Sequence, residues 1–250
     1  MIRLPFTLEI CAGNLASALN AYRAGAQRIE LCTSLETGGL TPSAGLIKYL
    51  KENTLLTLNV LIRPRPGNFY YNDQEFQVIL DDIQMCKDAG ADGIVVGLLN
   101  EDLTIDIGRC SQIKDAVGNM SLTFHRAFDM IEDSFQALEE LIVLGYDRIL
   151  TSGTMQTAYE GLVMIQELNS LADGRIIILP GSGINPSNID EIIRRTKVQE
   201  IHASAILKST AETPDMKSFR NQFTYNPEAI SHEETIRTLL RLGYQAVRSL

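Results

Sequence analysis

The chain lacks a basic cluster and any long apolar run, and both absences restrict its partners. It has 250 residues and a formal charge of -9 at pH 7, with acidic residues spread along its length. Without a basic patch, neither nucleic acid nor an anionic membrane is an expected partner. No apolar stretch reaches the roughly 18 residues that a membrane-spanning helix needs, so no segment is expected to cross a bilayer.

Secretory signals and paired zinc-site cysteines are missing as well. The N-terminal segment has no apolar core followed by a signal-peptide cleavage site, so we expect a cytoplasmic protein. Cys11, Cys32, Cys86 and Cys110 show no C-x-x-C spacing of the kind used by structural zinc sites. In a reducing compartment all four are expected to be thiols. Cys86 and Cys110 continue apolar helical stripes, which indicates positions in the core.

One phrase recurs through the sequence and indicates its architecture. Each copy begins at the end of a helical stretch, passes a glycine and enters a short apolar strand. The copies are residues 24–32 (AGAQRIELC), 89–97 (AGADGIVVG) and 144–152 (LGYDRILTS). This pattern is typical of repeated helix-to-strand connections. Eight strands are predicted in all, with helical stretches between them. They cover residues 7–11, 28–32, 57–63, 93–97, 121–125, 148–152, 176–179 and 200–204.

Eight such units in a chain of this length predict an α/β fold of the (β/α)8 TIM barrel type, with a C-terminal helical extension. An open doubly wound sheet is the alternative, but no glycine-rich loop follows the first strand. We assign the barrel to residues 1–204. Residues 205–250 are assigned to a polar tail and a helix that packs on the barrel, within a single domain.

Several helix boundaries are predicted from capping residues. Residues 41–42 (Thr-Pro) and 185–186 (Asn-Pro) each place an N-cap residue before a proline at the first helical position. Ser231 and Glu234 match a capping box at the start of a helix predicted over 231–242.

Five predicted strands have one apolar face and one polar face. Successive side chains of a strand point to opposite faces, and the surrounding helices require the apolar face. The polar face is therefore expected to point into the barrel, near the strands' C-terminal ends, where active sites of this fold lie. The candidate catalytic residues on this face are Glu9, Glu30, Arg63, His125 and His202.

Burial of these charged groups has two interpretations. Each buried charge costs roughly several kcal/mol unless it is paired, so the cluster is either a structural ion network or a functional site. Well-packed apolar residues often stabilise a core as well as such a network does, which favours function. Beyond His125, Arg126 and Asp129 are expected in the loop above it, where Asp129 either orients an imidazole or pairs with an arginine.

Two loops add candidate anion ligands. Residues 63–72 combine arginine with aromatic residues, which suits an oxyanion and a cover for the mouth, although a packed surface loop remains the alternative. After the seventh strand, Gly181, Ser182 and Gly183 precede a helix N-terminus, whose amides attract anions. With Ser204 they form a predicted phosphate or anion site between strands seven and eight.

Cys11 and Cys32 end adjacent strands on the polar face. Two thiolates in this arrangement suit a soft ion such as Cu(I), so these cysteines are the predicted metal ligands. Small residues that fill the barrel are the alternative interpretation.

Four runs of the sequence resemble those of the CutC family of copper homeostasis proteins. They are residues 30–43 (ELCTSLETGGLTPS), 62–71 (IRPRPGNFYY), 123–129 (TFHRAFD) and 148–153 (RILTSG). The resemblance implies a TIM barrel, a cytoplasmic location and a homodimer or larger homo-oligomer. It also implies copper as a ligand, with Cys11 and Cys32 at the positions of candidate copper-binding thiols.

Two functions are therefore expected from the sequence. The first is copper handling, with Cu(I) bound by Cys11 and Cys32. The second is acid/base catalysis on a small anionic or phosphorylated metabolite, with His125 or Glu30 as base and Arg63 on an oxyanion. No lysine lies at a strand end, so a Schiff-base aldolase is not expected.

Overall fold

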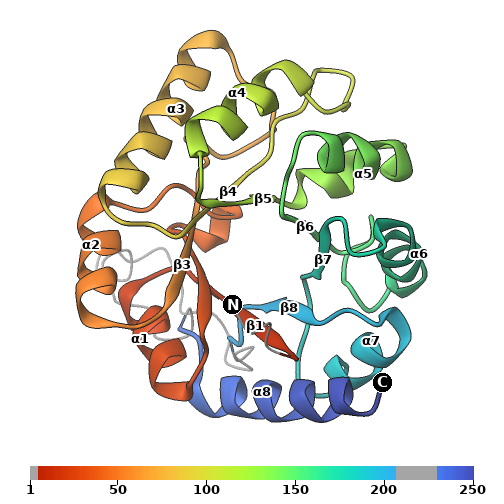
Figure 1. The fold of residues 1–250 in the computed structure, drawn as a ribbon. Coiled ribbons are helices and arrows are strands. Elements are labelled where there is room, and N and C mark those ends of the chain that lie inside the picture. The colour runs from red at the N-terminus through yellow and green to blue at the C-terminus, as the bar shows by residue number, and fades with distance from the viewer. Residues whose placement is uncertain (1–4, 207–229) are drawn as a thin grey trace, which may run out of the picture.

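A ring of parallel strands surrounded by helices forms the body of the molecule (Figure 1). The structure is a computed structural model that describes residues 5–206 and 230–250. The strands are β1 (Thr7–Ala12), β2 (Arg28–Leu31), β3 (Thr57–Leu61), β4 (Gly93–Val96), β5 (Ser121–Phe124), β6 (Arg148–Thr151), β7 (Ile177–Pro180) and β8 (Glu200–Ala203). The predicted (β/α)8 TIM barrel is confirmed.

All paired strands are parallel, in the order β7-β6-β5-β4-β3-β2-β1-β8. The two ends of this order, β7 and β8, lie beside each other and close the ring by contact, without a hydrogen-bonded ladder between them in the described part of the chain. Each predicted strand coincides with an observed one, and its ends differ by at most two residues. The short apolar runs and the recurring helix-to-strand phrase thus located every strand correctly.

Helices cover the outside of this ring and bury its apolar face. They are α1 (Leu15–Ala24), α2 (Ala44–Asn53), α3 (Asp73–Asp88), α4 (Ile107–Val117), α5 (Ser134–Val143), α6 (Leu162–Ala172), α7 (Ile189–Thr196) and α8 (Glu233–Arg248), with short 3-10 turns η1 (Leu35–Thr37) and η2 (Arg126–Met130). Outward-facing strand residues such as Ile10, Ile29 and Val60 are completely buried against these helices, in a core that also contains Cys86 and Cys110. The side chains at the alternate strand positions therefore face the barrel interior.

The strand register brings polar side chains of four neighbouring strands, β3, β2, β1 and β8, together. Glu9 of β1 stands opposite His202 of β8, and Cys11 of β1 stands opposite Glu30 of β2. Glu30 in turn stands opposite Asn59 of β3. Because these residues share the inward parity, one side of the barrel interior is polar and ionisable.

Two predicted helix starts are wrong by two or three residues, because the expected caps have other tasks. Helix α2 begins at Ala44, and the side chain of Ser43 caps it. Thr41 instead accepts a hydrogen bond from the amide of Arg63 and so fixes the end of β3. Helix α7 begins at Ile189, since the side chain of Asn185 is hydrogen-bonded to Ser187 in a turn that precedes the helix.

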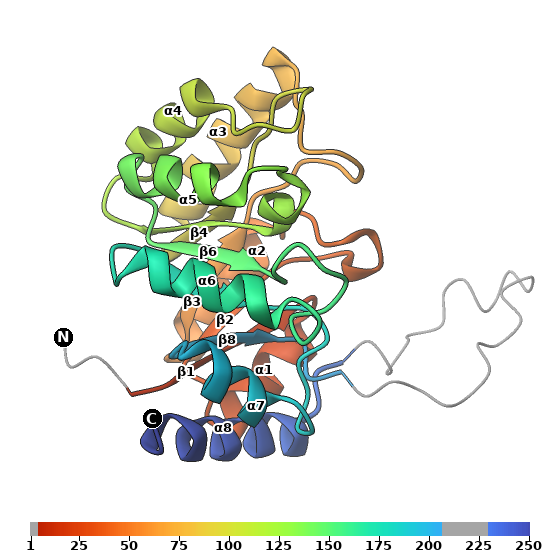
Figure 2. The same cartoon turned by 90° about the vertical axis from the view of Figure 1, so that its right-hand side faces the viewer.

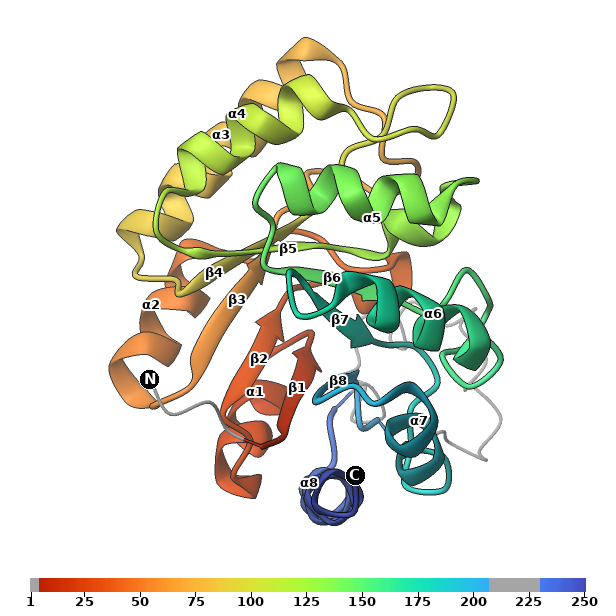
Figure 3. The same cartoon turned by 45° about the vertical axis from the view of Figure 1, so that its right-hand side comes forward.

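The C-terminal helix α8 lies along the barrel between α1 and α7, and Figure 3 shows it end-on. The helix predicted over 231–242 begins two residues later, at Glu233, and His232 is its N-cap residue, so the predicted capping box does not form. The Ser231 amide donates instead to Ser17 Oγ. Residues 207–229 of the predicted polar tail lie outside the described residues. Among the described helices, none is both long and apolar enough to span a bilayer.

Candidate functional site

A cavity of about 800 Å³ opens at the C-terminal ends of the strands. In Figure 2 the loops that follow β2 and β3 extend to the same side of the barrel, opposite the start of β1. Strand ends and these loops supply the cavity's polar lining. The lining includes Cys11, Glu30, Arg63, Phe69, His125, Arg126, Ser182, Gly183, His202 and Ser204.

Glu9 lies beneath the cavity and does not line it, unlike the other four candidate catalytic residues. Its carboxylate is 1% exposed and accepts hydrogen bonds from Arg28 at 2.6 Å and Asn59 at 2.8 Å. It also lies 2.9 Å from Nδ1 of His202. Burial favours the neutral acid, but the Arg28 charge and the His202 hydrogen bond outweigh it and hold the pKa of Glu9 far below its usual value. Glu9 therefore supports the site as a fixed negative charge.

An ion network at the other end of the barrel was not predicted from the sequence. Arg28 joins Glu9 to Glu200, and Arg148 also contacts Glu200, with N–O distances of 2.6 to 2.9 Å. Arg28 and Glu200 stand two residues before Glu30 and His202, on the same inward parity. Extending the alternation to the first residue of each strand would have found both.

Cys11 and Glu30, which line the cavity, form an ionisable cluster with the fully buried thiol of Cys32. One ligand atom from each of Cys11, Glu30 and Cys32 lies within 4.8 Å of the others. The Cys11 thiol donates to Oε1 of Glu30 at 3.9 Å, while Oε2 of Glu30 is buried without a partner among the described residues. Burial, with a smaller contribution from the Glu9 charge, raises the pKa of Glu30 to about 7. The Cys32 thiol and burial raise the pKa of Cys11 well above its usual value.

His202 connects this cluster to the network beneath. Burial opposes a charged imidazole, but the charge of Glu30 and hydrogen bonds with Cys11 and Glu9 raise the pKa of His202 well above its usual value. Ligand atoms of Glu9, Glu30 and His202 also lie within 4.8 Å of one another. A protonated His202 thus compensates for the buried carboxylates around it.

Arg63 follows β3, lines the cavity and is positioned by backbone carbonyls. Its guanidinium donates to the carbonyls of Thr37, Gly39 and Gly67 at 2.8 to 3.0 Å, and its Cζ lies 5.1 Å from the centre of the Phe69 ring. Gly38 has φ +89° and a Cβ there would lie 3.0 Å from Nη1, so glycine suits this close approach. The Nε of Arg63 is buried and finds no acceptor in the described part of the chain.

His125 also contacts Phe69, with ring centres 4.6 Å apart and ring planes inclined by 54°. Its Nδ1 accepts a hydrogen bond from the amide of Ala127 at 3.1 Å, so the ring proton of the neutral imidazole is on Nε2. Burial, and then the Arg63 charge, lower the pKa of His125 to about 3. Gly97 provides the space, because a Cβ there would lie 2.5 Å from Nδ1. The expectation of His125 as a base therefore disagrees with this geometry, in which Nε2 is a hydrogen-bond donor.

Other predicted loop residues divide between the cavity and the surrounding structure. Ser182, Gly183 and Ser204 line the cavity, whereas the amide of Gly181 donates to the carbonyl of Thr151 and is not available to a ligand. Of the aromatic residues in loop 63–72, Phe69 lines the cavity.

Asp129 does not contact an imidazole. Its carboxylate is 2.8 Å from Nε of Arg126 and accepts hydrogen bonds from Ser152 and neighbouring groups. The pair formed by Arg126 and Asp129 therefore ties η2 to the end of β6 at the rim of the cavity.

The sequence is similar to one protein family over most of its length. The model of the CutC family matches residues 6–207. The copper homeostasis protein cutC homolog of Homo sapiens is 44% identical over 216 residues, which cover 86% of this chain and 78% of that protein. Its Mus musculus counterpart is 42% identical over 229 residues, covering 92% and 83%. A CutC family protein of Treponema denticola is 44% identical over 211 residues, covering 84% and 85%.

Solved structures give the same relationship at the level of the fold. The structure of CutC from Streptococcus agalactiae superimposes with a TM-score of 0.75 at 35% identity, covering 80% of this chain and 98% of that one. The thiamine phosphate pyrophosphorylase of Pyrococcus furiosus has a TM-score of 0.61 at 14% identity, covering 97% of each chain. At that identity the second likeness shows the shared barrel alone.

Proposed function

Because the chain belongs to the CutC family, we propose that it acts in copper homeostasis and binds Cu(I) through the thiols of Cys11 and Cys32. Two relatives that are 42% and 44% identical carry the name copper homeostasis protein. In this proposal the copper ion is the cargo of the protein, which buffers or delivers it.

The placement of the two thiols is the observation that carries this proposal. Cys11 and Cys32 come from adjacent strands, and their sulfur atoms lie within 4.8 Å of each other. Thiolates are soft ligands, which select Cu(I) over harder ions such as Mg²⁺ or Ca²⁺. Cys11 lines the cavity, so an ion has a route to the pair, and a charged His202 compensates for added negative charge.

Titration with Cu(I) in the presence of a competing chelator tests the proposal. We expect one tightly bound ion per chain, and affinity at least about a hundredfold weaker in the Cys11→Ser, Cys32→Ser double variant, because its hydroxyls are poor ligands for a soft ion. The matched control is the Cys86→Ala, Cys110→Ala variant, which removes two thiols from the apolar core and should bind as the wild type does. Unchanged stoichiometry and affinity in the first variant would remove the thiol site.

A second function, acid/base chemistry on a small anionic metabolite, is favoured by the size and lining of the cavity. A volume of about 800 Å³ is far larger than one ion needs and is within the range of small-molecule sites. Oε2 of Glu30 and Nε2 of His125 are buried and unpartnered within the described residues. Native proteins rarely leave such atoms without a partner, so a ligand that satisfies them is the simplest explanation.

This second function is tested by a thermal-shift screen of small carboxylic acids and phosphorylated metabolites. Ligands that bind the folded state raise the midpoint of thermal unfolding. Stabilisation by at least one anion class is expected. The absence of any response, including to inorganic phosphate, would contradict the proposal.

A further inference from the structure

The face of the cavity around Phe69 carries a buried positive charge without a buried negative partner. Arg63 is 5% exposed and donates three hydrogen bonds to backbone carbonyls. The phenol of Tyr71 also interacts with Arg63, but it does not neutralise the charge, because burial raises the pKa of Tyr71. Among the described residues it forms no ion pair with a carboxylate. Carbonyl oxygens satisfy its donors but do not neutralise its charge, so burial of this guanidinium remains costly unless an anion joins it.

Two side chains on this face contact the same aromatic ring, and each keeps one hydrogen-bond donor without an acceptor among the described residues. Nε of Arg63 and Nε2 of His125 are both buried without an acceptor in the described ranges, and both side chains contact Phe69 and line the cavity. The hydrogen bond from Ala127 to Nδ1 makes Nε2 of His125 a donor. A ligand at this position must therefore supply acceptor atoms.

We propose that Arg63 and His125 form a subsite for a carboxylate group of a small organic acid. This inference deepens the second function proposed above, because it names the class of ligand that the cavity takes. Each of the two free donors can serve one oxygen of a planar group with two acceptor oxygens.

The charge of the subsite favours a carboxylate over a phosphate. Arg63 supplies one positive charge, whereas His125 is neutral above a pKa of about 3. A carboxylate carries one negative charge and matches this arrangement. A phosphate close to its dianionic form would bring excess negative charge and more acceptor atoms than the two free donors can serve.

Binding of acetate, pyruvate and inorganic phosphate to the full-length protein tests the inference. Calorimetric titration should show both carboxylates binding at least about tenfold more tightly than phosphate. In NMR spectra, the Nε2 proton of His125 should move downfield as it gains an acceptor. Arg63→Met should weaken carboxylate binding by at least about tenfold, a loss of about 1.4 kcal/mol. The control Arg175→Met should leave it unchanged, because Arg175 forms an exposed pair with Glu139 and does not line the cavity.

Two results would overturn the carboxylate subsite. One is phosphate binding as tight as carboxylate binding, and the other is carboxylate binding that leaves the His125 proton unmoved. The NMR measurement on the wild type decides the question even if Arg63→Met fails to fold. If carboxylates bind but none of them exchanges hydrogen with the solvent, the subsite stands and the acid/base function is contradicted.

Discussion

At the scale of single residues, the inward-facing polar groups divide into supporting and ligand-facing members. Glu9 is fully hydrogen-bonded beneath the cavity, whereas Glu30, Arg63 and His125 each keep one buried polar atom without a partner in the described residues. Sequence parity predicted that all of them point inward, and they do. It could not distinguish the two kinds, because that depends on which strand position lies opposite each residue. Likewise, the tautomer of His125 depends on an amide that only the folded η2 turn provides.

The ion network beneath the cavity predicts a large difference between two arginine variants. Arg28→Met removes the charge that Glu9 and Glu200 share and should lower the free energy of unfolding by about 3 to 5 kcal/mol. Arg175→Met breaks an exposed pair with Glu139 and should cost no more than about 1 kcal/mol. Urea denaturation of both variants measures this. Equal losses would mean that the Arg28 network does not stabilise the barrel.

The low pKa of His125 predicts a change in acid sensitivity. In the folded state this pKa is about 3, against 6.5 for the ordinary side chain, so the unfolded chain binds more protons between these values. Stability from the neutral ring is fully present above pH 6.5 and is lost as pH falls toward 3. Between pH 7 and pH 5, His125→Gln should lose about 2 kcal/mol less stability than the wild type.

Urea denaturation at several pH values checks this result. Arg63, the fixed charge that faces the ring, is present in both proteins, so the comparison isolates His125. The control His232→Gln lies at the exposed start of α8 and should follow the wild type. The explanation fails if the curves of His125→Gln and the wild type run parallel.

At the scale of elements, strand positions followed from the sequence more closely than helix starts. Alternation along a strand reflects the two sides of the barrel wall, which every strand shares. A helix start depends instead on which polar groups are free to cap it. Thr41 is engaged by the amide of Arg63, so α2 begins at Ala44 with Ser43 as its cap. That competition between a local cap and a contact 22 residues away is not visible in the sequence.

Helix α8 depends on a close contact with the residue before β1. A Cβ at Gly243 would lie 2.2 Å from the ring of Phe6, which is fully buried. Although alanine normally favours a helix over glycine, Gly243→Ala should destabilise the protein by about 1 to 3 kcal/mol through this overlap. Gly45→Ala, at an exposed position of α2 where a Cβ would meet only Ser43 Oγ at 4.0 Å, should instead stabilise by up to about 1 kcal/mol. Thermal unfolding of both variants tests the contact, and a stabilising Gly243→Ala would contradict it.

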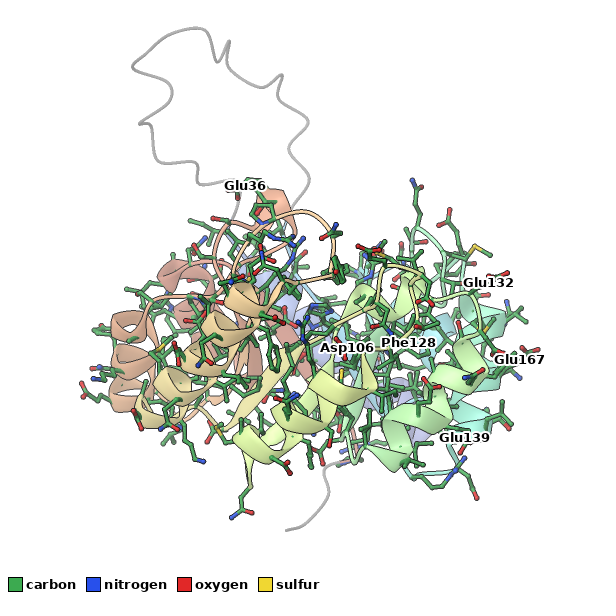
Figure 4. All side chains as sticks on the ribbon, turned by 90° about the horizontal axis from the view of Figure 1, so that it is seen from above. Glu36, Asp106, Phe128, Glu132, Glu139 and Glu167 are labelled. Carbon is green, nitrogen blue, oxygen red and sulfur yellow. The ribbon has the colours of Figure 1, made fainter. Side chains whose placement is uncertain are left out.

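At the scale of the whole molecule, acidic side chains lie on the surface, and the cavity contains groups of both positive and negative charge. Figure 4 shows Glu36, Glu132, Glu139 and Glu167 at the periphery, in keeping with the formal charge of -9. The cavity lining includes Cys11, whose sulfur lies within 4.8 Å of that of the buried Cys32, together with Arg63 and His125. The sequence predicted the barrel and these inward residues. The grouping of the two thiols required the register of β1 with β2, and the position of Arg63 required the loop conformations that hold it.

X-ray absorption at the copper edge of the Cu(I)-loaded protein tests the central claim most directly, because it identifies the atoms bound to the ion. We predict two sulfur ligands in the wild type and their loss in the Cys11→Ser, Cys32→Ser variant. A first coordination shell of nitrogen and oxygen alone in the wild type would contradict the copper site proposed for this barrel.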